Sequence, residues 1–124
     1  MSVHDGNPMT FKALAIDLDG TLLVGEDLPE ANIVALRAAR DAGLQIIIAT
    51  ARWIQMAQRV EAQIGLHGPA IACSGAQVFL PDLGRDIFDE RLPEDFVEEL
   101  YALCNEERCI ATITVEDRVL VKLD

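Results

Sequence analysis

The chain has 124 residues, of which 51% are hydrophobic, and this length suits one ordinary domain or one domain and part of another. Its formal net charge is −11 without any cluster of lysine and arginine, which excludes the electrostatic signature of proteins that bind nucleic acid or an anionic membrane surface. No apolar stretch approaches the roughly 18–20 residues of a spanning helix, and residues 1–10 lack the features of a signal peptide. We therefore expect a short disordered tail over residues 1–10 and a cytoplasmic protein.

The first predicted strand covers residues 11–17, a continuous apolar run that only Lys12 interrupts, as is typical of a strand covered on both faces. Residues 44–49 ("LQIIIA") and 69–74 ("PAIACS") are predicted to form the next two strands. Helical patterns separate the three runs. A strand and helix series with short links is typical of a doubly wound parallel sheet of the α/β class.

The helix expected from Pro29 to Gly43 has a face rich in small residues, which we expect to pack closely on the sheet. The second helix, expected to end at Gly65, has larger apolar residues on one face. The small residues of the first helix are Ala31, Ala35, Ala38, Ala39 and Ala42, and the apolar residues of the second are Trp53, Ala57, Val60 and Ile64.

The pattern changes after the third strand. Residues 81–84 are predicted to form a turn, residues 85–90 a short strand, and the residues after Pro93 a helix with an apolar and a strongly acidic face. Two further strands joined at residues 116–118 are predicted to form a hairpin. We therefore predict one unit over residues 11–85 and the beginning of a second, α+β unit over residues 86–124.

Cys73, Cys104 and Cys109 are odd in number and form no Cys-x-x-Cys motif. This pattern favours neither a disulfide framework nor a zinc site. We interpret the three residues as small buried hydrophobic side chains.

Each of the three predicted parallel strands ends in polar or reactive residues. In open α/β sheets, ligands bind outside the carboxyl ends of the strands, so we expect these residues to form one site. They are Asp17 and Asp19 after the first strand, Thr50 and Arg52 after the second, and Ser74 and Gly75 after the third.

Two neighbouring carboxylates are tolerable when a divalent cation lies between them, and Mg²⁺ prefers such oxygen ligands. Asp17 and Asp19 are therefore the predicted metal ligands. Aspartate can also accept a phosphoryl group covalently, which makes Asp17 a candidate nucleophile, whereas Asp19 is placed to act as general acid and then as base.

Further residues suit the binding of a phosphate group. Gly20 lets backbone N–H groups approach a phosphate, Thr21 adds a hydroxyl group, and Arg52 adds a charged donor fork. Each feature also has a plain structural interpretation: Thr50 as the N-cap of the following helix, Arg52 as a solvated helix residue, and the segment Ser74–Gly75 as a turn.

At these residues the sequence resembles the haloacid dehalogenase superfamily of phosphatases. "AIDLDGT" is similar to its first motif, the threonine that ends "IIIAT" to its second, and "ATAR" with "CSGAQVF" to the Cof-type branch, which has a cap domain inserted after the third strand. The resemblance implies a Rossmann-like core, phosphorylation of Asp17, acid–base action and a backbone metal contact by Asp19, and phosphoryl binding by Thr50. Small phosphorylated metabolites such as sugar phosphates are the substrates it implies.

The sequence departs from this branch in two respects. Ala51 and Ser74 stand where the branch commonly has glycine and asparagine, and the lysine and the acidic pair of the third and fourth motifs do not occur; Lys122 lies in the predicted hairpin and does not replace that lysine. We therefore expect the N-terminal part of a Cof-type hydrolase, with half of the core and the opening of the cap, and negligible activity for this chain alone. We also expect the first strand to be an open edge through which the chain can self-associate.

Two alternatives to a phosphatase stay open. One is a non-catalytic module that binds phosphate and metal or accepts a phosphoryl group, and the other is an inactive remnant that retains the motif. They differ in whether aspartyl-phosphate forms on Asp17 and in whether it is then hydrolysed.

Overall fold

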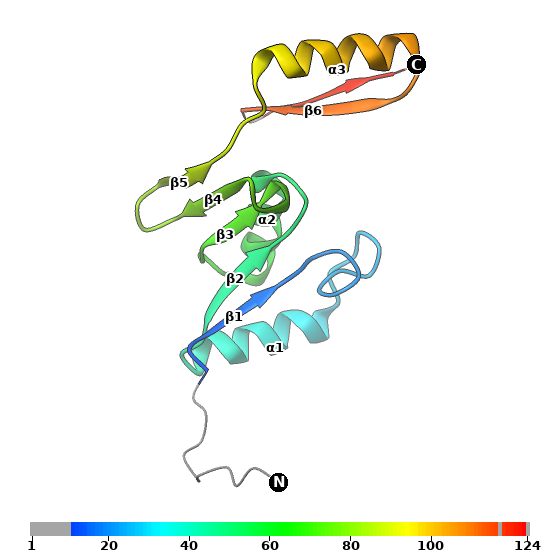
Figure 1. The fold of residues 1–124 in the computed structure, drawn as a ribbon. Helices are drawn as coiled ribbons and strands as arrows, with labels where there is room; N and C mark the ends of the chain where they lie inside the picture. The colour runs from blue at the N-terminus through cyan, green and yellow to red at the C-terminus, as the bar shows by residue number, and fades with distance from the viewer. Residues whose placement is uncertain (1–10, 117, 124) are drawn as a thin grey trace, which may run out of the picture.

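The computed structural model describes residues 11–116 and 118–123, so the tail expected over residues 1–10 lies outside the described residues. A mixed sheet with two helices forms the first unit, and a helix beside a small two-stranded sheet forms the second (Figure 1). In chain order, the elements are β1 (Ala13–Ile16), α1 (Glu30–Asp41), β2 (Gln45–Ala49), α2 (Ile54–Ile64), β3 (Ala70–Ala72), a 3₁₀ turn (Cys73–Gly75), β4 (Gln77–Leu80), β5 (Arg85–Asp89), α3 (Glu94–Glu106), β6 (Ala111–Val115) and β7 (Arg118–Lys122).

The larger sheet has the strand order β1-β2-β3-β4-β5. β1, β2 and β3 are parallel to one another, which confirms the predicted α/β core, and β4 and β5 add an antiparallel hairpin to it. β4 was not predicted as a strand, and β5 extends the sheet to Asp89, past the boundary predicted at residue 85. β1 lies at the end of this order and has only β2 as a partner among the described residues.

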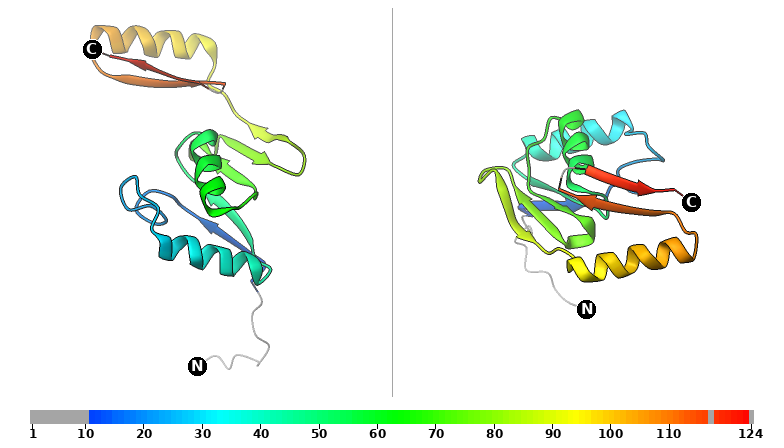
Figure 2. Two further views of the ribbon diagram at one scale, coloured as in Figure 1. Left: turned by 180° about the vertical axis from the view of Figure 1, so that it is seen from behind. Right: turned by 90° about the horizontal axis from the view of Figure 1, so that it is seen from above.

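α1 and α2 lie on the same face of this sheet (Figure 2). Arg37 of α1 donates a hydrogen bond from Nε to the carbonyl oxygen of Ile64 at 2.7 Å, and Arg40 donates one from Nη1 to that of Gly65 at 2.8 Å. Both guanidinium groups thus bind carbonyl groups at the C-terminal end of α2, where the helix dipole favours positive charge.

The main core lies between this face of the sheet and the two helices. Burial alternates along β2, and along β1 the side chains of Ala13 and Ala15 are exposed. The prediction that β1 is covered on both faces is therefore wrong for the described residues. One face of β1 packs against the helices, and the other face is open. The largest fully buried side chains are those of Leu18, Leu22, Ile48 and Ile64.

α1 packs on the core through its larger side chains instead of its alanines. Leu36 is buried, with Ile33 beside it, and among the five alanines only Ala39 is partly buried. The prediction that the alanine-rich face covers the sheet is therefore wrong. Leucine and isoleucine remove more apolar surface from water than alanine does, so rotation of the helix towards them is favoured.

α2 follows its prediction closely. Its buried face includes Ile54, Ala57, Val60 and Ile64, and the helix ends at Gly65, whose φ of 83° is the left-handed conformation common after a helix C-terminus. Because this face packs on the sheet, the start of α2 and the residues between β2 and α2 lie next to the carboxyl ends of β2 and β3.

Glu61 is a buried carboxyl group on the same helix. It is 6% exposed and its Oε1 has no hydrogen-bond partner among the described residues. Burial raises the pKa of Glu61 to about 7, although a hydrogen bond from the backbone of Gly68 acts in the opposite direction.

Gly68 also lies close to the backbone of β2. A side chain at position 68 would bring its Cβ within 2.2 Å of the Ile46 carbonyl oxygen, so only glycine allows this close approach.

The second unit consists of α3, β6 and β7, which confirms the predicted helix and hairpin. Within it only Cys104 is buried among the apolar side chains of the described residues, while Phe96, Leu103 and Leu120 are exposed. Of the three cysteines, Cys73 is half-buried and Cys109 is exposed, so the interpretation of all three as buried hydrophobic residues is wrong for Cys109. Among the described residues, no helix combines the length and the apolar character needed to span a membrane.

Candidate functional site

The segment that follows β1 alternates between buried leucines and exposed polar residues. Leu18, Leu22 and Leu23 are at most 3% exposed, and the backbone N–H of Leu23 donates to the carbonyl oxygen of Leu18 at 2.8 Å. Gly20 lies between them with a φ of 72°, a left-handed conformation that suits glycine. The leucines therefore anchor the turn in the core and leave Asp17 and Asp19 exposed at its surface.

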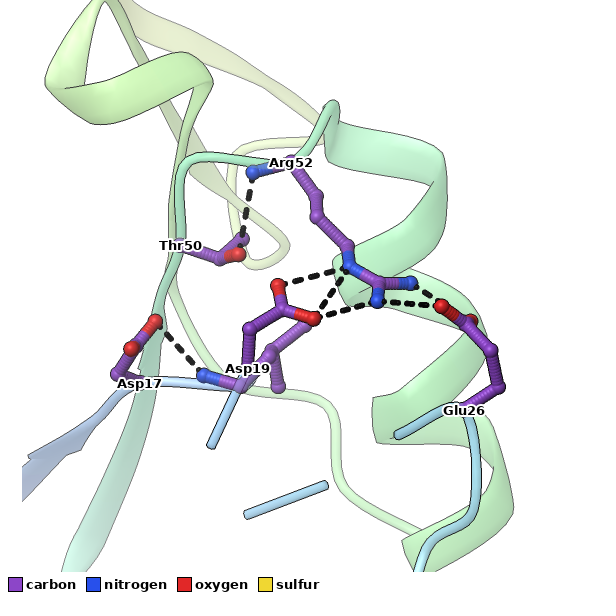
Figure 3. Close-up of polar contacts among 6 residues, drawn as sticks. Asp17, Asp19, Glu26, Thr50 and Arg52 are labelled. Atoms are coloured by element: carbon purple, nitrogen blue, oxygen red, sulfur yellow. Dashed lines mark hydrogen bonds and ion pairs between the residues drawn. The ribbon is translucent and has the colours of Figure 1, made fainter. Parts of the chain in front are cut away.

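Asp17 lies directly after the last residue of β1. Its Oδ1 accepts a hydrogen bond from the backbone N–H of Leu18 at 2.8 Å, and the carboxylate is exposed (Figure 3). A carboxylate with one oxygen hydrogen-bonded locally is held in place, and its second oxygen stays available to an incoming group. This arrangement suits a nucleophile.

Asp19 points towards Arg52, which follows β2 (Figure 3). Arg52 Nε donates to Asp19 Oδ2 at 2.8 Å, and on its other edge Nη1 and Nη2 donate to the two carboxylate oxygens of Glu26 at 3.1 and 2.9 Å. Hydrogen bonds from Arg52 lower the pKa of Asp19 and the pKa of Glu26, and the two carboxylates raise the pKa of Arg52. Charge-assisted bonds therefore join the first loop to the second.

Glu26 was missed by the sequence interpretation. It lies in the turn between β1 and α1, and an isolated exposed glutamate in such a turn carries no motif. Only the fold brings it opposite Arg52, 26 residues further along the chain. Its presence means that both edges of the guanidinium group are occupied by carboxylates, so an arriving phosphate has to compete for them.

Thr50 is buried and lies between the ends of β2 and β3. Its Oγ1 accepts a hydrogen bond from the backbone N–H of Arg52 at 3.1 Å, and its carbonyl oxygen accepts one from Ser74 at 3.2 Å. The N-cap residue of α2 is Trp53, so the interpretation of Thr50 as that N-cap is wrong. Its contacts instead fix the loop that carries Arg52.

The loop after β3 is hydrogen-bonded to the loop after β2. The backbone N–H of Cys73 donates to the carbonyl oxygen of Arg52 at 2.8 Å. Cys73 and Ser74 have φ angles of 51° and 56°, and Gly75 has 96°. Non-glycine residues rarely adopt such angles, and strained backbone of this kind is concentrated at functional sites.

The structure thus groups Asp17, Asp19, Thr50 and Arg52 at the carboxyl ends of β1 and β2, with Ser74 bound to Thr50 through the backbone (Figure 3). Thr21 is exposed on the same turn as Gly20, and its backbone N–H donates to the carbonyl oxygen of Leu18 at 3.3 Å.

The described residues do not form a complete metal site. Carboxylate oxygens are the right kind of ligand for Mg²⁺, which demands near-octahedral oxygen coordination. The carboxylate of Asp19 is bound to Arg52, however, and nowhere in the part of the chain that the structure describes do three His, Cys, Asp or Glu side chains gather in a way that could hold a metal ion. Of the two predicted metal ligands, only Asp17 has a carboxylate oxygen without a hydrogen bond among the described residues, so these residues supply only part of the ligands that the ion needs.

The amino-acid sequence of the chain is similar to those of known proteins. The sequence profile of the haloacid dehalogenase-like hydrolases matches residues 14–124. A pyridoxal phosphate phosphatase, YbhA of Escherichia coli, is 31% identical over 113 residues, which are 90% of this chain and 42% of that protein. A phosphoglycolate phosphatase of Pyrobaculum aerophilum is 40% identical over 75 residues, which are 58% of this chain and 32% of that protein.

A solved structure has the same arrangement of elements. The phosphatase BT1666 of the same superfamily, from Bacteroides thetaiotaomicron, superposes with a TM-score of 0.73 at 29% identity. The match covers 97% of this chain and 44% of that one. The chain therefore spans about a third to a little under half of the length of the relatives it matches.

Proposed function

Since the chain belongs to the haloacid dehalogenase-like hydrolases, we propose that the protein hydrolyses phosphate monoesters of small metabolites through an aspartyl-phosphate. The observation that carries this proposal is the turn after β1, in which three buried leucines hold Asp17 and Asp19 exposed beside Thr50. Relatives named as phosphatases support the reaction class.

The reaction has two steps. A carboxylate oxygen of Asp17 forms a bond to phosphorus while the bond to the ester oxygen breaks, and the leaving alcohol takes a proton from Asp19. Water then attacks the phosphorus of the acyl-phosphate and gives a proton to Asp19, which releases phosphate and restores the carboxylate of Asp17. Thr50 holds the loop that brings Arg52 to the same place.

Arg52 links substrate binding to the protonation of Asp19. Its hydrogen bonds lower the pKa of Asp19, so without substrate Asp19 is a carboxylate and not an acid. A substrate phosphate that draws the guanidinium group away from Asp19 removes this effect, and the pKa of Asp19 then rises. Protonation of Asp19 is thereby favoured where a substrate is bound.

Mg²⁺ is the cofactor we propose from the resemblance and from the hard oxygen ligands of the turn. Asp17 and the backbone carbonyl group of Asp19 are the groups of this chain that would contact it. The described residues do not supply a full set of ligands, so no reaction step is assigned to the ion.

The substrate class we propose is small phosphorylated metabolites, because relatives act by name on pyridoxal phosphate and on phosphoglycolate. We propose no nucleic acid or membrane partner and a cytoplasmic location, in keeping with the net charge of −11.

The test is hydrolysis of a panel of small phosphate monoesters by the protein expressed from its native reading frame, because the matched relatives are longer than this chain. We expect turnover that Asp17→Asn abolishes and that the matched variant Asp27→Asn, in the exposed turn before α1, retains. Turnover that both variants retain would remove Asp17 from the reaction. An unmodified protein without any turnover on the panel would favour the phosphoacceptor module or the inactive remnant.

A further inference from the structure

Cys104 and Cys109 lie in contact at the end of α3, well separated in sequence from Asp17, Asp19 and Arg52. Cys104 is buried and belongs to the last turns of the helix, whereas Cys109 is exposed and precedes β6. The Sγ of Cys109 lies 3.7 Å from the carbonyl oxygen of Cys104, to which it donates a hydrogen bond. The sequence spacing alone does not predict this contact.

The contact arises from the way in which the helix ends. The backbone N–H of Cys109 donates to the carbonyl oxygen of Cys104 at 3.1 Å, and Arg108 between them has a φ of 51°. A left-handed residue followed by such a bond across five positions is the Schellman ending of a helix, and this ending brings the side chains of its first and last residues together. Here both of those side chains are thiols.

We propose that Cys104 and Cys109 form a site of reversible oxidation, which reacts with small-molecule disulfides such as oxidised glutathione to give an intramolecular disulfide bond. This inference does not depend on the proposed phosphatase reaction. The helix ending brings the thiol of Cys109 to the backbone of the residue that carries the second thiol, and a disulfide bond requires two cysteines that lie this near to each other. Lys122 of β7 donates a hydrogen bond from Nζ to the carbonyl oxygen of Cys109 at 3.1 Å, which fixes the segment that carries the exposed thiol.

The two thiols have different roles in the exchange. The hydrogen bond with Cys109, followed by burial, raises the pKa of Cys104, so Cys104 is not the first nucleophile. The thiolate of exposed Cys109 attacks one sulfur of glutathione disulfide, and the disulfide bond of the reagent breaks to release one glutathione thiolate. Cys104 then loses its proton and attacks the sulfur of Cys109, which releases the second glutathione. Two protein thiols are oxidised, one reagent disulfide is reduced, and both protons pass to the released glutathione.

The experiment equilibrates the full 124-residue chain with mixtures of reduced and oxidised glutathione, in buffer and in concentrated urea. Trypsin cleaves after Arg108, so a disulfide between Cys104 and Cys109 appears in mass spectra as two linked peptides. We expect an equilibrium constant for this disulfide at least about tenfold larger in buffer than in urea, equivalent to about 30 mV in reduction potential. In urea the chain is unfolded, and the two cysteines are close only because five positions separate them in the sequence. The difference between the two equilibrium constants therefore measures what the folded contact adds.

Two variants complete the design. Cys73→Ser should oxidise like the unmodified chain, and Cys104→Ser should stop at a mixed disulfide between Cys109 and glutathione. Equal equilibrium constants for the disulfide in buffer and in urea would overturn the assignment. A main product with a disulfide bond to Cys73, or with a disulfide bond between two chains, would overturn it as well.

Discussion

Arg52 and Asp19 are joined by hydrogen bonds, with Arg52 Nε 2.8 Å from Asp19 Oδ2, although 33 residues separate them in the chain. Each follows the end of a parallel strand, and β1 and β2 are direct neighbours in the sheet. The pairing of these strands therefore brings the candidate acid to the cation that lowers its pKa.

The first prediction concerns the pKa of Asp19. Arg52 lowers this pKa mainly through hydrogen bonds, so Arg52→Ala should raise it towards the ordinary aspartate value. Arg52→Lys keeps the charge without the planar fork and should raise it less. Carbon-13 NMR titration of the carboxyl group measures both variants. An Asp19 that titrates identically in Arg52→Ala and in the unmodified chain would refute the proposed control.

Glu26 provides the second prediction, since it occupies the edge of Arg52 that Asp19 leaves open. Glu26→Gln removes a charged competitor, so inorganic phosphate should bind several-fold more tightly, on the order of three- to tenfold. The NMR signal of the Arg52 side chain reports this binding. Asp27→Asn removes the same charge from the next position. If it increases the affinity for phosphate as much as Glu26→Gln does, the change in net charge explains the effect and the contact between Glu26 and Arg52 does not.

The sequence predicted the parts of the site that depend on local pattern. The apolar runs before Asp17 and Thr50 are continuous, so the strands and the polar residues at their ends could be placed. Glu26 could not be predicted, because its contact with Arg52 depends on how two loops meet in space.

Burial within the fold was harder to predict from sequence. The alanines of α1 formed a regular face, but Leu36 and Ile33 gain more from burial and decide which side packs on the core. β4 has only four residues, and its place in the sheet follows from its pairing with β3, which the local pattern does not contain.

Glu61 gives a prediction for the dependence of stability on pH. Burial raises its pKa to about 7, so the folded protein holds a proton that the unfolded chain releases at lower pH. Its contribution to stability is present below the pKa of the unfolded chain and is lost as the pH rises through about 7. Glu61→Gln removes the ionisation and should raise the free energy of unfolding at pH 8 by about 1–3 kcal/mol.

Urea unfolding of both proteins at pH 5 and pH 8 measures this effect. Glu30→Gln, at an exposed position of α1, is the matched control and should change neither value. If Glu61→Gln is no more stable than the unmodified chain at pH 8, the buried carboxyl group is not the cause of the pH dependence.

The free edge of β1 leads to a prediction about association. β1 has only β2 as a partner among the described residues, its exposed side chains include Ala13 and Ala15, and an edge with few charges tends to pair with another chain. We propose that two copies pair along β1, so Ala15→Lys should weaken association in sedimentation experiments. Ala38→Lys, exposed on α1, adds the same charge elsewhere and should not. Equal effects of both variants, or a chain that is monomeric without them, would argue against pairing along β1.

The most direct measurement of the central claim is chemical trapping of the phosphoryl group on Asp17. Borohydride reduces an aspartyl-phosphate to homoserine, so protein expressed from its native reading frame, mixed with substrate and quenched with borohydride, should contain homoserine at position 17 in peptide mass spectra. Asp19 should stay unchanged, because its proposed role is proton transfer. Homoserine at position 19, or turnover of substrate without homoserine at either position, would contradict the assignment of Asp17 as the nucleophile.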